Sequence, residues 1–346
     1  MASSSNSSTK EIIDLNKILT SNDSTEIQRM QREFESNGWC FVSLPKELIP
    51  TSALTHELQK FFQSDAAKKR YSQFDPIYGY SQVDHKEGLK LLTGSYYGQF
   101  ANKGLVPRNL VQPLNYLSQA FDVVTKRLIE LLDQHCVFQS QPSLSTLIQK
   151  ADLPLKDEHF GMLDIVSYFN KKNGFKAPEN GESTEEVNCV PHYDPGLLSI
   201  SILSTHEGLQ LKDMRRNEWI DGPVESNVGV IWLGEAAVRA TENRLKAGIH
   251  RVVYPQTAGI RLTMWYEVCT VEQLKNLSSK KQNEVMAAGN VVFHNLPGSK
   301  PIAVRNGETR LEFLRRVEMA NGLSMSKSGP PHYKLDKHDI SYSTNI

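Results

Sequence analysis

The chain has 346 residues, of which 39% are hydrophobic and 23% are charged, so it is long enough to bury a sizeable core. Its 39 Lys and Arg residues balance 39 Asp and Glu residues, which excludes the extended basic surface that a nucleic-acid-binding protein needs. No apolar run approaches the length of a membrane span, and residues 1–10 form a polar tail without the apolar segment of a secretory signal. We therefore expect a cytoplasmic monomer with no membrane or nucleic-acid partner.

Helical spacing of apolar residues predicts helices in the first part of the chain. Ile27, Met30 and Phe34 share one face of a helix that Asp23 or Ser24 would cap and Gly38 would end. Further helices are expected over residues 51–63 and 111–136. Between these two helices, residues 78–98 are rich in aromatic, cationic and glycine residues, and we expect a loop there.

Later in the chain, alternation of apolar and polar residues predicts strands. Leu198, Ile200 and Ile202 alternate with Ser199 and Ser201, which is the two-residue period of a strand with one buried face. Further strands are expected over 227–234, 250–254 and 260–268, and helices over 270–288 and 309–321.

Two imidazoles and one carboxylate are the candidate metal ligands. His192 and Asp194 are two residues apart, so their side chains lie on one side of an extended chain, and His250 begins a later strand. This set matches the two-His-one-carboxylate face of a non-haem Fe(II) site, which leaves the opposite metal positions open. His-x-Asp alone is common by chance, but the joint order and spacing favour a metal site over structural histidines.

The last predicted strand adds a candidate anion site. Arg261 and Thr263 share one of its faces with Trp265, so a guanidinium and a hydroxyl could hold one carboxylate together. The four cysteines have no Cys-x-x-Cys spacing, which predicts reduced thiols. We do not expect Cys189, three residues before His192, to bind the metal, because open Fe(II) sites favour histidine and carboxylate.

Residues 11–268 resemble the isopenicillin N synthase-like branch of the Fe(II)/2-oxoglutarate-dependent dioxygenases. The resemblance is carried by the His-x-Asp-x-Gly segment at 191–196, by Gly208-Leu209-Gln210-Leu211, by Trp219 fifteen residues before Gly234, and by His250-Arg251-Val252. The N-terminal part contributes Ile13-Asp14-Leu15 and Gly38-Trp39-Cys40-Phe41-Val42. The resemblance implies a mixed α/β chain with a mainly β core, a double-stranded β-helix (jelly roll) flanked by N-terminal and C-terminal helices.

On this resemblance we expect four segments. They are a flexible polar tail over 1–10, an N-terminal helical region over 11–150, the jelly-roll core over 151–275 and a C-terminal helical extension over 276–346. Two departures concern the pocket. Tyr168 lies in Ser-Tyr-Phe-Asn where the family has Asn-Tyr-Tyr-Pro, and Trp232 begins Trp-Leu-Gly-Glu where the family has Asn-Ile-Gly-Asp. Neither departure removes a metal ligand.

The resemblance implies an oxidoreductase that uses Fe(II), 2-oxoglutarate and O₂, with ascorbate as a possible reductant. His192, Asp194 and His250 would be the catalytic metal ligands, and Arg261, Thr263 and Tyr168 would bind 2-oxoglutarate. The enzyme would release succinate and CO₂ while it oxidises a C–H bond, by hydroxylation, desaturation or ring closure. The sequence does not choose among these three reactions.

For the substrate we expect a small molecule with a carboxylate, derived from an amino acid or belonging to secondary metabolite biosynthesis. The candidate substrate residues are Lys86, Lys90, Tyr96 and Trp232, which would combine an aromatic wall with a cationic edge. Three alternatives stay open: an iron oxidase of the same fold that does not consume 2-oxoglutarate, a non-catalytic jelly-roll binding protein, and a Zn²⁺ hydrolase on the same three ligands.

Overall fold

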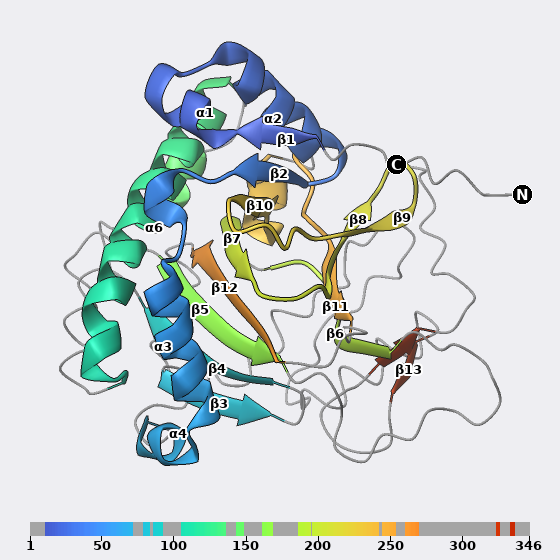
Figure 1. The fold of residues 1–346 in the computed structure, drawn as a ribbon. Helices are drawn as coiled ribbons and strands as arrows, with labels where there is room; N and C mark the ends of the chain where they lie inside the picture. Colours follow the sequence, from blue (N-terminus) through green and yellow to red (C-terminus); the bar gives the residue numbers. More distant parts are fainter. Residues whose placement is uncertain are drawn as a thin grey trace, which may run out of the picture.

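The computed structural model describes residues 11–71, 79–83, 86–92, 105–135, 143–148, 161–168, 186–194, 196–241, 244–253, 260–269, 323–325 and 333–335. Within these residues the chain forms two β-sheets, with helices packed on the larger one (Figure 1).

The larger sheet, here called the main sheet, has eight strands in the order β1-β2-β10-β7-β12-β5-β4-β3 among the described residues. The strands are β1 (Ile12–Asp14), β2 (Trp39–Ser43), β3 (Gly79–Val83), β4 (Lys86–Leu92), β5 (Gly161–Tyr168), β7 (Leu198–Ser204), β10 (Val228–Leu233) and β12 (Arg261–Val268). Strand β12 pairs antiparallel with β5 on one side, where Arg261 lies opposite Tyr168, and with β7 on the other side.

The smaller sheet, here called the second sheet, has the order β13-β14-β6-β11-β8-β9. Its strands are β6 (Glu186–His192), β8 (Leu209–Asp213), β9 (Glu218–Asp221), β11 (His250–Val253), β13 (Leu323–Met325) and β14 (Tyr333–Leu335). The mainly β core with flanking helices matches the expected double-stranded β-helix, so the predicted fold class is confirmed.

The helices are α1 (Leu15–Ser21), α2 (Ser24–Ser36), α3 (Ser52–Gln63), α4 (Asp65–Tyr71), α6 (Arg108–His135) and α7 (Glu235–Ala240), with short 3₁₀ turns at Lys46–Leu48 and Leu144–Ile148. Figure 1 shows α3 and α6 along one face of the main sheet. The core on this face includes Leu262, Met264 and Tyr266, and the Phe121 ring of α6 stacks on Tyr266 with centroids 4.9 Å apart. The alternating residues of β12 thus face opposite layers, as predicted.

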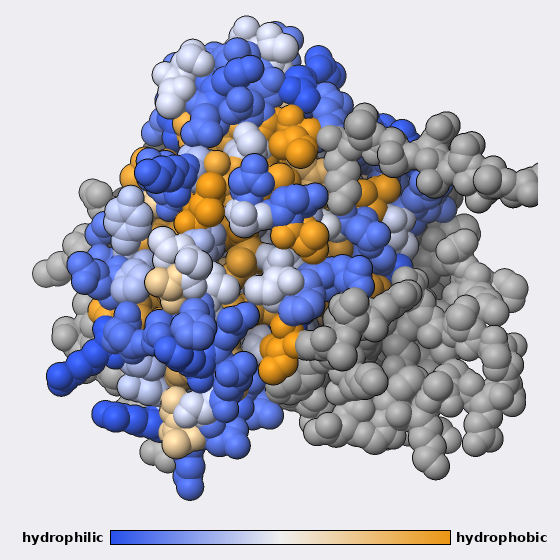
Figure 2. Space-filling view, in the orientation of Figure 1, coloured by the Kyte–Doolittle hydropathy of each residue, from blue (hydrophilic) through white to orange (hydrophobic). Residues whose placement is uncertain are grey.

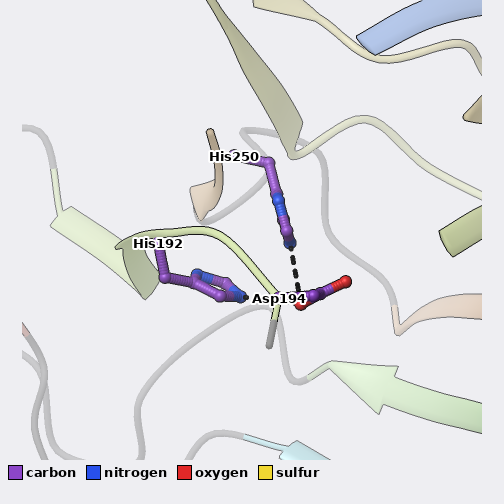
Figure 3. A group of neighbouring side chains, drawn as sticks. All are labelled: His192, Asp194 and His250. Carbon is purple, nitrogen blue, oxygen red and sulfur yellow. Dashed lines mark ion pairs between the residues drawn. The ribbon is translucent and has the colours of Figure 1, made fainter. Parts of the chain in front are cut away.

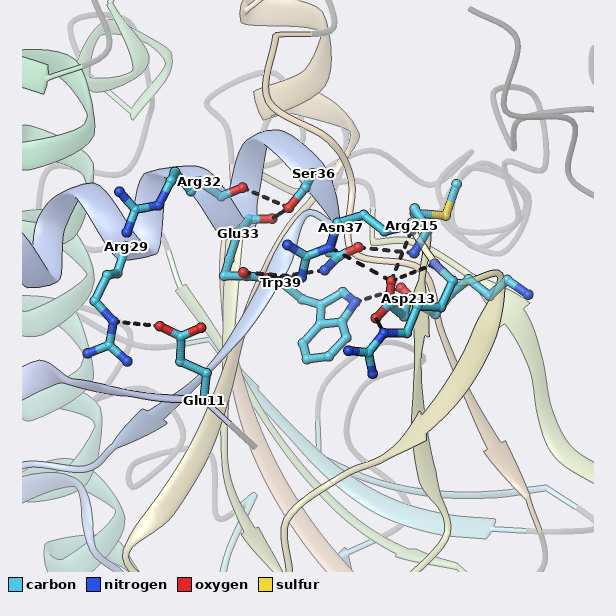
Figure 4. A network of polar contacts seen from close by, with 12 residues as sticks. Glu11, Arg29, Arg32, Glu33, Ser36, Asn37, Trp39, Asp213 and Arg215 are labelled. Atoms are coloured by element: carbon cyan, nitrogen blue, oxygen red, sulfur yellow. Dashed lines mark hydrogen bonds and ion pairs between the residues drawn. The ribbon is translucent and has the colours of Figure 1, made fainter. Parts of the chain in front are cut away.

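A polar network joins the end of α2 to the turn between β8 and β9 (Figure 4). The Trp39 indole N–H donates to the Lys212 carbonyl at 2.7 Å, and the Met214 N–H donates to the Asn37 side chain at 3.0 Å. Arg215 pairs with Glu33 at 3.0 Å. These contacts fix β2, the strand next to β10, against the second sheet.

The predicted helices at 24–37, 51–63 and 111–136 are confirmed, with Asp23 capping α2 through hydrogen bonds from Thr25 N and Glu26 N. The loop expected over 78–98 is wrong where the structure describes it, because β3 and β4 form a hairpin whose second strand pairs with β5. The helices expected over 270–288 and 309–321 lie outside the described residues. The domain boundaries at 150 and 275 stay predictions, although β1 to β4 come from the segment expected to be helical.

Figure 2 shows hydrophilic residues over most of the helical part of the visible face, with apolar residues between them near its middle. Among the described residues, no helix combines the length and the apolar character needed to cross a bilayer.

Candidate metal centre and its pocket

His192, Asp194 and His250 come together at one point between the sheets (Figure 3). One ligand atom from each of these residues lies within 4.8 Å of the other two. Oδ1 of Asp194 is 3.9 Å from Nε2 of His192 and 3.9 Å from Nε2 of His250. The three predicted ligands therefore form one group, with the donor set and spacing that suit a single metal ion.

Strand pairing in the second sheet produces this arrangement. His192 ends β6, His250 begins β11, and the two residues are paired across these strands. Residues paired across an antiparallel ladder point to the same side, which places both imidazoles on one face, with ring centroids 4.2 Å apart. Asp194 lies two residues after the end of β6 and supplies the third candidate ligand beside the two imidazoles.

The surroundings of His250 keep its imidazole in the neutral form. Its Nδ1 lies 3.0 Å from the Gly248 carbonyl, so in the neutral imidazole Nδ1 donates to that oxygen and Nε2 is directed at the metal position. Burial, helped by the neighbouring His192, lowers the pKa of His250 to about 4. At neutral pH this imidazole is therefore unprotonated, which is the form that binds metals.

The two oxygens of Asp194 have different partners. Oδ1 faces the histidines, whereas Oδ2 accepts hydrogen bonds from the Trp232 indole at 2.5 Å and from the Ser199 hydroxyl at 2.7 Å. Burial alone would raise the pKa of Asp194, but His250, His192 and these two hydrogen bonds together hold that pKa below its ordinary value. The carboxylate is thus charged and fixed in orientation.

A pocket beside the ligands is lined from the opposite side by Arg261, which the sequence predicts as an anion-binding residue. Its side chain is 1% exposed, and its Nε donates to the Ser204 hydroxyl at 3.0 Å. Within the described part of the chain its Nη1 has no hydrogen-bond partner. Burial lowers the pKa of Arg261 to about 10, so the guanidinium is still a cation at neutral pH. A buried guanidinium with one free N–H group of this kind fits a bound carboxylate.

Thr263 and Tyr168 also line the pocket. The Thr263 hydroxyl donates to the Leu203 carbonyl at 2.8 Å, so it would have to turn to donate to a bound carboxylate. The Tyr168 ring lies 5.3 Å from the Arg261 guanidinium carbon, and burial raises the pKa of its phenol, which keeps the phenol protonated. Both residues stay predicted binding residues.

Of the predicted substrate residues, Lys86 lines the pocket and places its Nζ 5.7 Å from the centroid of the Tyr168 ring. Lys90 does not line it, because its Nζ pairs with Asp164 Oδ2 at 3.3 Å, so the structure gives no support to its substrate role. Tyr96 lies outside the described residues. Cys189 is half-buried, with Sγ 3.8 Å from Nδ1 of His192, and does not belong to the ligand group.

Trp232 lines the pocket too, but its contacts differ from the expected substrate wall. The indole is 3% exposed, bonds to Asp194 and packs on His250 with ring centroids 4.6 Å apart. The sequence reasoning missed this contact and the one from Ser199. One feature of the sequence could have indicated the contact from Ser199: Ser199 and Ser201 form the polar face of β7, the strand that directly follows the metal-binding motif.

Residues 165–270 match the family model of the 2OG-Fe(II) oxygenase superfamily. Over 68 residues the chain is 34% identical to the 2-oxoglutarate-dependent dioxygenases citB of Monascus ruber and mpl2 of Monascus purpureus. These matches cover 20% of this chain and 21% of each fungal relative, so the chain spans about a fifth of the relatives' length.

Solved structures give the same fold over more of the chain. The rice dioxygenase for auxin oxidation matches with a TM-score of 0.57 at 16% identity, covering 90% of this chain and 96% of that one. The Arabidopsis thaliana dioxygenase for auxin oxidation 1, in complex with 2-oxoglutarate, matches with a TM-score of 0.55 at 18% identity over 75% of this chain and 92% of that one. At these identities the likeness shows the fold.

Residues 165–270 thus resemble the 2OG-Fe(II) oxygenase superfamily, and the family resemblance predicted from the sequence is confirmed over this segment. Members of this superfamily use Fe(II) and 2-oxoglutarate. The donor set at His192, Asp194 and His250 fits the iron, and the unpartnered Nη1 of Arg261 fits a carboxylate.

Proposed function

We propose that the chain is an Fe(II)/2-oxoglutarate-dependent oxygenase that oxidises a C–H bond of a small carboxylated molecule. The observation that carries this proposal is the buried guanidinium of Arg261, whose Nη1 has no hydrogen-bond partner among the described residues, in the same pocket as the three metal ligands. In the alternatives of a Zn²⁺ hydrolase or a non-catalytic binding protein, this second, cationic end of the pocket has no assigned role.

In the proposed complex, Nε2 of His192, Nε2 of His250 and Oδ1 of Asp194 would hold the iron, and Arg261 would hold the far carboxylate of 2-oxoglutarate. When bound, iron and 2-oxoglutarate would activate O₂, the oxidant, which takes two electrons from the keto acid as it becomes succinate and CO₂ and two from a C–H bond of the substrate. The protein contributes placement, because the carbon held nearest to the metal is the one that reacts.

An apolar cluster covers one side of the pocket. Trp232 belongs to a buried cluster that includes Trp39, Phe41, Leu209 and Leu211. Excluding water from this side strengthens the electrostatic interactions of Arg261 and Asp194 and protects reactive species from side reactions.

Lys86 supports the finer proposal that the substrate carries a carboxylate. Its ammonium lies on the pocket face of β4, opposite Tyr168 of β5, so the pocket has a second cation besides Arg261. With Arg261 assigned to 2-oxoglutarate, Lys86 is available to pair with a substrate anion. The plant structural relatives are named for the oxidation of auxin, which agrees with a small-molecule substrate.

The test begins with the protein, Fe(II) and 2-oxoglutarate in the absence of O₂. A visible charge-transfer absorption should appear, and admission of O₂ should then give succinate. Asp194→Ala should abolish both signals because three protein ligands leave no redundancy. A screen of carboxylated small molecules, each paired with its neutral amide, should find compounds that accelerate succinate release, and Lys86→Met should reduce the preference for the acid.

Succinate release that persists in Asp194→Ala would contradict the metal assignment. Oxidation of a substrate without consumption of 2-oxoglutarate would favour the alternative of an iron oxidase of the same fold.

A further inference from the structure

The carboxylate of Asp194 is held by two donors that come from a different sheet. Trp232 is on β10 and Ser199 is on β7, and these residues are paired across the two strands of the main sheet. Asp194 follows β6 of the second sheet. Both donors are buried, at 3% and 1% exposed, and both bond to Oδ2.

These hydrogen bonds distinguish the two carboxylate oxygens. An ionised carboxylate is acceptor-only, with about four lone-pair sites on its two oxygens. The indole and the hydroxyl donate to Oδ2, while Oδ1 lies 3.9 Å from the Nε2 atom of each histidine. A metal at the centre of the ligand group would therefore meet one oxygen of Asp194, because the other is directed at the main sheet.

We propose that Trp232 and Ser199 are positioning residues that keep Asp194 a one-oxygen ligand, a proposal that rests on the metal site of the proposed function. Chelation by both oxygens would use one more of the metal positions that the two-His-one-carboxylate set leaves open. Trp232 also packs on His250, so one side chain of the main sheet contacts two of the three ligands. Outer partners of this kind typically change metal affinity about 10–100-fold.

The test uses Co(II), whose ligand-field absorption reports the coordination number, and measures its dissociation constant by calorimetry without 2-oxoglutarate. Trp232→Phe keeps an aromatic ring but removes the indole N–H, and Ser199→Ala removes the hydroxyl. Each change should weaken Co(II) binding by about 10–100-fold, because the carboxylate loses a donor that holds its orientation, and should alter the absorption spectrum, because Oδ2 becomes free to bind. Ser199→Thr, which keeps the hydroxyl, should bind Co(II) more tightly than Ser199→Ala does.

Trp39→Phe is the matched control. Trp39 lies directly opposite Trp232 across β2 and β10, belongs to the same buried cluster, and also donates its indole N–H, but to the Lys212 carbonyl. This variant should lose a similar part of the free energy of unfolding and keep the affinity and spectrum of the wild type. If Trp232→Phe does not fold, the Ser199 variants alone decide the question.

Equal Co(II) affinity and identical spectra in the wild type, Trp232→Phe and Ser199→Ala would overturn the positioning role and leave the metal site intact. Failure of the wild type to bind Co(II) at all would instead overturn the metal site, and the positioning role with it.

Discussion

A partly buried ion pair lies on the same face of the main sheet as the pocket residues. Lys90 of β4 and Asp164 of β5 are paired across the two strands, with Nζ 3.3 Å from Oδ2, and Asp164 is also paired with Trp265 of β12. Burial raises the pKa of Asp164, with Lys90 acting in the opposite direction, while the attraction of Asp164 raises the pKa of Lys90. The lysine therefore compensates for a carboxylate that would otherwise be costly to ionise inside the protein.

Lys90→Met should destabilise the fold in a pH-dependent way. Without the lysine, the pKa of Asp164 rises further above its unfolded value, so the folded state holds its proton more tightly than the unfolded state does. Stability then falls as pH rises from about 4 to 7, and we expect a loss of about 1–3 kcal/mol at neutral pH, allowing for the partial exposure of Lys90. Urea unfolding at several pH values measures this.

The companion variant Lys90→Met/Asp164→Asn removes the carboxylate as well as the lysine. It should recover most of the lost stability and show no added dependence on pH. A Lys90→Met protein whose stability does not change between acidic and neutral pH would show that the pair is not what keeps Asp164 ionised.

At the scale of elements, the end of β10 supports the loop that carries Asp194. Gly234 follows β10, and a Cβ there would lie 2.1 Å from the Gly196 carbonyl oxygen and 2.8 Å from the Asp194 carbonyl oxygen. The Gly234 N–H donates to Leu197, and the Gly196 N–H donates to Glu267 of β12. Asp194, Gly196 and Leu197 are therefore held between two strands of the main sheet, and a side chain at Gly234 would displace them.

Gly234→Ala should weaken Mn(II) binding by about tenfold or more. The new Cβ forces the backbone of Asp194 to move by several tenths of an ångström, whereas the side chains of such a site must stay within about half an ångström of their working positions. Gly229→Ala is the matched control. It lies in β10, where a Cβ would meet Leu44 and the Ser201 carbonyl, away from the ligand loop. Both variants should lose stability, but only the first should lose metal affinity in calorimetric titrations. Equal Mn(II) affinity in the two would mean that the loop relaxes without moving the carboxylate.

The strands that matter for the site could be predicted where one face is apolar and the other polar. The alternation predicts β7, and the residue order of β12 separates its two faces, while strands at 227–234 and 250–254 are also expected from the sequence. The sequence predicts a loop where β3 and β4 form a hairpin. On β4 the apolar Leu89 and Leu91 face the core, but the residues that alternate with them are Lys86, Gly88 and Lys90, which are typical of loops. Charges on the interior face of a sheet are rare outside binding sites, so the pattern was misleading for a functional reason.

The same limit applies to the site itself. The ligands are close in sequence or follow a familiar motif, so they were predicted, whereas the bond from Trp232 to Asp194 spans 38 residues and depends on how the two sheets are paired. The pattern of residues within one strand carries no information about a contact between two different sheets. Trp232 could be recognised as unusual in the sequence, but its partner only follows from the fold.

At the scale of the whole molecule, the proposed site connects the two sheets. His192 and His250 belong to the second sheet, and Arg261 belongs to the main sheet. Iron alone would bind at the second sheet and its following loop, whereas 2-oxoglutarate held at both ends would also bind the main sheet. We therefore expect the metal to stabilise the folded chain by itself, and 2-oxoglutarate to stabilise it only after the metal has bound.

Thermal unfolding with redox-inert Mn(II) tests this order without turnover. Mn(II) should raise the unfolding temperature, and 2-oxoglutarate should raise it further only when Mn(II) is present, because the keto acid needs the metal at one end and Arg261 at the other. A ligand at a hundredfold excess over its dissociation constant adds about 2.7 kcal/mol to the free energy of unfolding. Arg261→Met should keep the increment from Mn(II) and lose the one from 2-oxoglutarate. If 2-oxoglutarate stabilised this variant as much as the wild type, the far carboxylate would have to bind elsewhere in the pocket, and Lys86, the other cation that lines it, would be the next residue to replace.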